Sequence, residues 1–76
     1  MTQVSVTAQA WQLLGRAYYQ LGDYKKSISS LENAIALAEE EGYKPKESWY
    51  VILAASISEL KEAMLGFRSR VVVTWN

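Results

Sequence analysis

Apolar side chains recur at helical spacing in the first part of the chain. Between residues 4 and 21 the large ones are three, four and three positions apart: Trp11, Leu14, Tyr18 and Leu21. This spacing places them on one face of an α-helix. Gly22 follows, and glycine readily adopts the left-handed conformation in which many helices end. We therefore expect a helix over 4–21 with this stripe buried.

A second apolar stripe runs from about residue 24 to 41. Asp23 precedes it, and its carboxylate is a good N-cap because it can accept from free N–H groups of the first turn. Gly42 is expected to end the helix. The acidic run Glu39–Glu41 allows two interpretations, a solvated helix end or a metal site, and we favour the first because charge runs are usually solvated. The stripe consists of Tyr24, Ile28, Leu31, Ile35 and Ala38.

The third stretch begins near Pro45, a residue suited to the first turn of a helix. Its pattern carries to about residue 65, and Gly66 is expected to end it. The last residues, 68–76, read RSRVVVTWN. Three consecutive valines have strand character and no helical face, so we predict an extended tail. Three roles stay open for it: a disordered end, an extended segment packed on the helices, or a strand paired with another chain.

Residues 8–41 carry a more specific pattern. Trp11, Leu14-Gly15, Tyr18, the Leu21–Tyr24 segment and Ala34 follow the spacing W-x2-L-G-x2-Y…A, which resembles a tetratricopeptide repeat. Three-helix bundles of other kinds show similar stripes, but Gly15 favours the repeat. Glycine inside a helix costs about 1 kcal/mol relative to alanine, so it needs a packing reason. The resemblance implies a helical hairpin in which Gly15 lets the second helix approach the first closely.

The second half of the chain resembles the repeat more weakly. Trp49 and Ile52 match Trp11 and Leu14, but Leu53 and Ser56 stand where glycine and tyrosine are expected. Residues 46–65 are therefore interpreted as a partial repeat or a capping helix. The expected fold class is all-α, a hairpin plus a third helix with boundaries near 4–21, 24–41 and 45–65. We expect one domain over 1–76, with the tail at 66–76.

Composition excludes several classes of function. The chain has 76 residues, 21% charged and half apolar, which is typical of one small globular domain. Its formal net charge is zero, so no basic excess favours nucleic acid. It has no His and no Cys, which removes the commonest general base, thiol catalysis and Cys/His zinc sites. We expect no enzyme, no cofactor and no metal.

The sequence gives little information on location. Residues 1–10 carry no basic residue and no apolar block, so they do not resemble a secretory signal. No apolar run is long enough to span a membrane, and no segment has the Lys/Arg-rich face of a membrane-binding helix. We expect a cytoplasmic protein if the chain is complete, and otherwise leave the compartment open.

Proteins of the family that the chain resembles act as binding scaffolds, which implies a protein or peptide partner. By position, the partner-binding residues would be Gln12, Arg16, Tyr19, Gln20, Tyr50 and Ala54. Arg16 can bind a carboxylate, the glutamines can hydrogen-bond an extended backbone, and each tyrosine offers a flat apolar face and a hydroxyl. The alternative is that these residues are simply the solvent-facing side of two helices.

Self-association is the second hypothesis, because the third helix has apolar side chains on more than one face. A two-fold dimer that stacks or exchanges third helices would cover them. Glu at both Val51 and Met64 is expected to give a monomer. The alternative function is then a purely structural dimerisation module with no separate ligand, which would bury the Arg16 and Tyr19 face. The predicted self-association residues are Val51, Ile57, Met64, Phe67, Val72 and Trp75.

Overall fold

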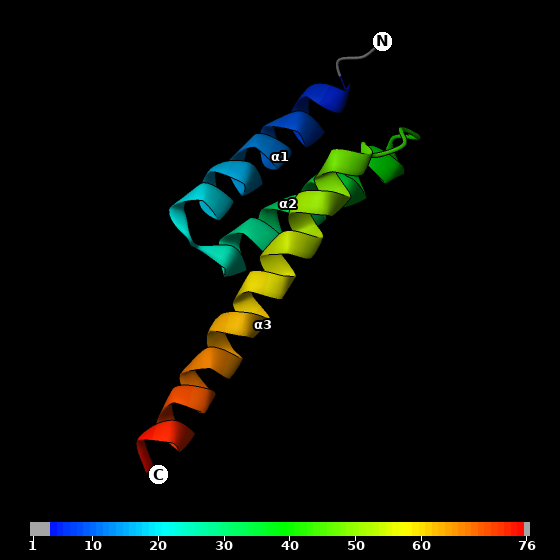
Figure 1. Cartoon of the computed structure of the whole chain (residues 1–76). Coiled ribbons are helices and arrows are strands. Elements are labelled where there is room, and N and C mark those ends of the chain that lie inside the picture. The colour runs from blue at the N-terminus through cyan, green and yellow to red at the C-terminus, as the bar shows by residue number, and fades with distance from the viewer. Residues whose placement is uncertain (1–3, 76) are drawn as a thin grey trace.

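Three helices make up the fold. The structure is a computed structural model that describes residues 4–75, with side chains described for residues 7–65. The helices are α1 (Val4–Leu21), α2 (Tyr24–Glu40) and α3 (Glu47–Trp75). Figure 1 shows α1 and α2 as an antiparallel hairpin, with α3 returning along α2 and extending past the α1–α2 turn. The predicted all-α class and the hairpin are confirmed.

The turn between α1 and α2 is built as its residues predict. Gly22 has φ +85°, a conformation that carries no steric penalty for glycine. The Asp23 N–H donates to the Tyr18 carbonyl at 2.9 Å, which closes a Schellman motif at the end of α1. The Asp23 carboxylate in turn accepts from the Lys26 N–H at 3.3 Å and caps α2. One short segment therefore satisfies backbone groups of both helices.

α2 ends in the same way as α1, with a glycine of positive φ and a backbone hydrogen bond that closes the last turn. Gly42 has φ +84°, and the Tyr43 N–H donates to the Ala38 carbonyl at 2.7 Å. The prediction that Gly42 ends this helix is confirmed. The connection that follows places α3 against α2, with Glu47 in its first turn, where the partial positive charge of the helix end favours an acidic side chain.

Gly15 lies where α1 packs closely on α2. A Cβ atom at this position would lie 2.7 Å from Leu31 Cγ and 3.2 Å from the Ser27 carbonyl oxygen. Real Cβ atoms do not approach other heavy atoms as closely as 2.7 Å, so glycine is required for this spacing. Leu31 has no exposed surface and fills the place opposite Gly15. The packing reason inferred for this glycine is therefore confirmed.

Small side chains dominate the core. Ala8, Ala34 and Ala38 from the hairpin surround Trp49, which brings the start of α3 into the same cluster. Ser27, near the start of α2, and Ser56 of α3 are both fully buried. Their Oγ atoms lie 2.8 Å apart in a hydrogen bond that joins the two helices. A core of alanine, serine and glycine holds helices close together but buries little apolar area.

The predicted buried stripe of α1 is only partly correct. Trp11 and Tyr18 are half-buried, but Leu14 is 41% exposed and Leu21 78% exposed. The face that packs on α2 instead runs through Ala8, Gln12 and Gly15, which are buried. The physical reason is close packing: α2 approaches the side of α1 with the smallest residues, so the large apolar side chains lie beside the contact.

The predicted end of the third helix is wrong. α3 continues through Gly66 to Trp75 instead of giving way to an extended tail over 68–76. Glycine costs only about 1 kcal/mol in a helix interior, and valine costs less. Extending a formed helix also adds one hydrogen bond per residue fixed. Strand propensity alone has no such compensation, because an extended segment needs a partner strand.

Candidate functional site

The predicted binding residues of α1 do not all face solvent. Arg16 and Gln20 are exposed, while Tyr19 is half-buried and packs edge-on against Tyr24 with ring centroids 5.6 Å apart. Gln12 is only 8% exposed because it lies on the face that packs on α2. Arg16, Tyr19 and Gln20 can therefore present polar groups to a partner, whereas the Gln12 side chain belongs to the core.

The predicted binding residues of α3 are both exposed. Tyr50 donates its hydroxyl hydrogen to Glu39 Oε2 of α2 at 3.4 Å, and Ala54 lies one turn farther along. Partial desolvation raises the pKa of the Tyr50 hydroxyl, and the adjacent Glu39 carboxylate adds to the increase. The raised pKa favours the protonated hydroxyl, which is a hydrogen-bond donor beside an acidic side chain.

The predicted binding residues lie on two helices, α1 and α3, that make few contacts with each other. α2 packs against both α1 and α3, while α1 and α3 contact each other only slightly. Arg16 and Gln20 on one side and Tyr50 and Ala54 on the other therefore belong to one layer of helices, without being gathered into a common pocket. This arrangement suits an extended partner better than a small enclosed ligand.

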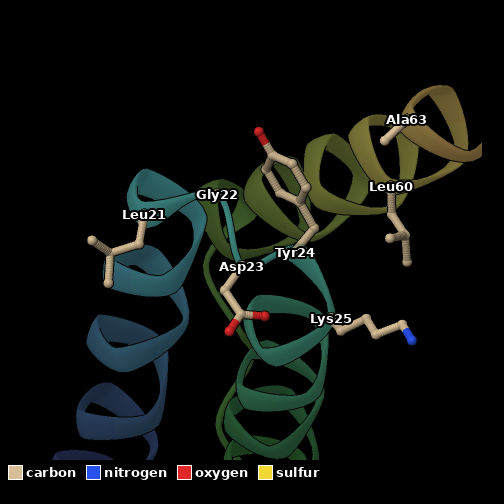
Figure 2. Close-up of a pocket in the computed structure, with 7 residues that line it drawn as sticks. All are labelled: Leu21, Gly22, Asp23, Tyr24, Lys25, Leu60 and Ala63. Carbon is tan, nitrogen blue, oxygen red and sulfur yellow. The ribbon is translucent and has the colours of Figure 1, made fainter. Parts of the chain in front are cut away.

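A shallow hollow lies where the α1–α2 turn meets α3. Figure 2 shows its lining side chains pointing in different directions, with Leu21 and Lys25 turned outward on opposite sides. The Asp23 carboxylate is already engaged in capping α2. Because these groups do not converge, the hollow offers no set of polar atoms for one ligand. It is lined by Leu21, Gly22, Asp23, Tyr24, Lys25, Leu60 and Ala63.

A second hollow, of about 170 Å³, lies on the outer side of α1. Its lining is almost entirely apolar and comes from α1 alone: Thr7, Ala10, Trp11 and Leu14. None of the described side chains of α2 or α3 lines it. The apolar pattern at Trp11 and Leu14 predicts a contact surface inside the hairpin; Trp11 does pack partly against the core cluster, but Leu14 is 41% exposed. The buried face of α1 can be found from Gly15, because Ala8 and Gln12 lie on the same side of the helix as this glycine.

The predicted self-association residues within the described side chains lie on the surface of α3. Val51 is 64% exposed, Met64 is 62% exposed and Ile57 is 45% exposed. Phe67, Val72 and Trp75 lie outside the described side chains. The side chains of Val51, Ile57 and Met64 are therefore accessible to a second chain.

The described residues also bear on a metal site and on a membrane-spanning helix. Among residues 7–65 no cluster of three or more acidic side chains is arranged to hold a metal ion, and this range includes Glu39–Glu41. None of the helices, as far as they are described, combines the length and the hydropathy needed to cross a bilayer.

The fold thus defines a helical-hairpin array in which a close-packed pair is extended by a third helix. Residues 8–41 match the family model of the tetratricopeptide repeat, so the α1–α2 hairpin is one such repeat. Comparisons with curated proteins and with solved structures gave no significant match. A repeat of this kind implies a protein-interaction helical module, and no enzyme family was found. The partial repeat at 46–65 lies outside the match and stays a prediction.

Proposed function

We propose that this chain is a non-catalytic module that binds a peptide or protein segment along α1 and α3. The tetratricopeptide repeat at 8–41 supports a protein partner. The exposed polar residues of the two helices supply the chemistry of contact. The residues assigned to the partner are Arg16, Tyr19, Gln20, Tyr50 and Ala54.

The observation that carries this proposal is the isolation of Arg16. It is exposed, and it is the only charged residue of α1. No salt bridge neutralises it among the described residues, and its neighbours on this side are the exposed Gln20 and the half-exposed Tyr19. A guanidinium with free donors beside amide and phenol groups favours a carboxylate on an extended segment. The expected partner is therefore an acidic peptide or a chain terminus.

Selection from a displayed library of short random peptides tests this proposal. Peptides that bind the intact chain are expected to be rich in Asp, Glu or a free C-terminal carboxylate, and Arg16→Ala is expected to weaken their binding about tenfold or more. Lys25→Ala, which removes an exposed cation from α2, is the matched control and should leave binding unchanged. Equal binding by the Arg16 and Lys25 variants would refute the assignment of this face.

Self-association is a second function, supported by the exposure of Val51 and Met64 on α3. Large exposed apolar side chains on a helix are common at contacts between chains. Light scattering after size-exclusion chromatography, over a series of protein concentrations, measures the mass directly. A dimer or larger species that the double variant Val51→Glu/Met64→Glu converts to monomer is the expected result. An intact chain that is monomeric at every concentration rules this function out.

A further inference from the structure

One side of α3 carries an apolar stripe that the hairpin covers only in part. Its residues alternate three and four positions apart, which is the spacing with which one helix packs along another. Leu53 and Leu60 are half-buried, whereas the other three side chains are exposed. The stripe therefore runs along the edge of the α2–α3 contact and is open to water on its outer side. It consists of Tyr50, Leu53, Ile57, Leu60 and Met64.

The middle helix forms one margin of this stripe. Near the start of the stripe, the Tyr50 hydroxyl donates to Glu39 of α2 at 3.4 Å. Near its other end, Leu60 lines the same hollow as Lys25 of α2, and Figure 2 shows Lys25 extending on the side where Leu60 lies. Lys25, Glu32 and Glu39 are exposed and seven residues apart, so they follow one line along α2. This margin is therefore acidic beside the start of α3 and basic at the far end.

The other margin lies on α3 itself and has the same order of charge. Glu47, Ala54 and Lys61 are exposed and seven residues apart, and they follow a line beside the stripe. The remaining acids of α3 within the described side chains, Glu59 and Glu62, lie roughly 140–160° around the helix from the middle of the stripe. On each margin the glutamate at one end and the lysine at the other are separated by about 21 Å of helix. The stripe thus has acidic groups at its start and basic groups at its end.

A helix that runs antiparallel to α3 fits this order of charge. Its first turn would lie between Lys25 and Lys61, and its last turn between Glu39 and Glu47. The macrodipole favours acidic side chains in the first turn of a helix and basic ones in the last turn. The charges that stabilise such a helix are therefore also the charges that the two margins attract, and Glu32 adds to the attraction for basic groups. An extended segment fits less well, because its side chains repeat every second residue.

We propose that this stripe binds an amphipathic helix of a partner protein, antiparallel to α3, with acidic residues in its first turn and basic residues in its last turn. A helix of about 14 residues spans the distance between the charged ends of the margins. Its apolar side chains, three and four residues apart, pack between those of the stripe. The inference goes beyond the peptide site proposed above, because the partner is a helix and Arg16 of α1 takes no part in binding it.

Two designed peptides of about 18 residues, long enough to form a helix, test this proposal by fluorescence anisotropy. Both carry leucines three and four residues apart. The first has Glu in its first turn and Lys in its last turn, and the second has these charges exchanged. The first peptide is expected to bind the intact chain about tenfold more tightly than the second. Ile57→Glu should weaken its binding about tenfold or more, because a charge then lies in the middle of the stripe. Ser58→Glu is the matched control, since Ser58 is exposed on a different side of α3, and it should leave binding unchanged.

The double variant Glu47→Lys/Lys61→Glu tests the orientation with the same two peptides. It reverses the charges of the margin on α3, so the preference for the first peptide should be lost or inverted, and an unchanged preference overturns the antiparallel arrangement. Circular dichroism checks that each variant folds.

Three other results would overturn the proposal. Neither peptide binds, or Ile57→Glu and Ser58→Glu have equal effects. The intact chain is a dimer that Ile57→Glu alone converts to monomer, in which case a second copy covers the stripe. Arg16→Ala abolishes binding of the first peptide, which places it at the extended-segment site instead. Selection of acidic peptides through Arg16 is a separate measurement, so the peptide site can hold where the helix site fails, and the reverse.

Discussion

Gly15 sets the distance between the two helices of the repeat. Its missing side chain lets Leu31 and the Ser27 carbonyl oxygen lie where a Cβ would clash. The sequence was informative here because glycine is unfavourable in a helix interior and needs a compensating contact. The same position also defines which face of α1 is buried, so one residue determines both the spacing and the rotation of the helix.

Gly15→Ala is expected to destabilise the fold by up to about 2 kcal/mol. Helix propensity alone would favour alanine by about 1 kcal/mol, but the overpacking against Leu31 and Ser27 typically costs about 1–3 kcal/mol. The reverse change at an exposed position of the same helix, Ala17→Gly, should cost about 1 kcal/mol through propensity alone. Urea unfolding followed by circular dichroism measures both. A Gly15→Ala variant more stable than the parent would contradict the close approach of α2.

The hydroxyls of Ser27 and Ser56 form the only described buried hydrogen bond between side chains of α2 and α3. Ser56→Ala leaves a fully buried hydroxyl without this partner, and we expect a loss of about 1–3 kcal/mol. Adding Ser27→Ala should cost little more, because both polar groups are then removed together. A double-mutant cycle with a coupling of about 1 kcal/mol is the expected result. Strictly additive losses would mean that the bond does not couple the two helices.

The hydrophobic pattern predicts that helices form more reliably than it predicts what covers them. The hairpin, the glycine ends and the N-cap at Asp23 follow from local chemistry and are all present. The apolar stripe through Leu14 and Leu21 is real, but most of it is not covered by this chain. A periodic pattern cannot distinguish a face that packs on the next helix from one that meets another molecule. Only the small residues at the helix crossing carry that information.

The length of α3 depends on the helix propensity of its last residues and on the gain from extending a helix that has already formed. Residue types give only the first of these. Gly66 and the valines that follow suggested an end, because each is a weaker helix former than alanine. A preceding helix of nearly twenty residues reduces the penalty, since no new nucleus is needed. The extended tail was predicted from residues 68–76 alone, without the helix that precedes them. The prediction is wrong because a helix already formed can be extended at little cost.

Gly66→Ala tests the continuation of α3. If the helix passes through residue 66, alanine should favour it by about 1 kcal/mol and raise the helical signal in circular dichroism. Gly66→Pro should lower the signal, because proline removes a hydrogen bond and clashes with the preceding turn. A chain whose helical signal is the same with Gly, Ala and Pro at this position would instead have a helix that ends before it.

The three helices together explain which of the predicted site residues are exposed and which are buried. Arg16, Gln20 and Ala54 are exposed, and Tyr50 is also exposed although its hydroxyl reaches Glu39 of α2. Gln12 was assigned to the same surface by analogy with other repeats, but the rotation of α1 buries it. The hollow beside Trp11 was not predicted at all, since a large aromatic at helical spacing is usually a core residue. Trp11 does pack partly against the core cluster, and the hollow lies on the part of its side chain that the described residues of α2 and α3 do not line.

Assembly and stability should be linked in this molecule, because the core is small and the uncovered apolar faces are large. A partner that binds only the folded chain stabilises it by mass action, about 2.7 kcal/mol at a hundred times the dissociation constant. For a chain of this size each kcal/mol raises Tm by about 4–8 °C. The intact chain should therefore melt at higher temperature as its concentration rises, whereas Val51→Glu should have one Tm at all concentrations. Leu13→Glu, which changes an exposed leucine of α1 and leaves α3 intact, should follow the intact chain. If Val51→Glu shows the same concentration dependence as the parent, the side of α3 that carries Val51 is not the surface through which copies of this chain stabilise one another.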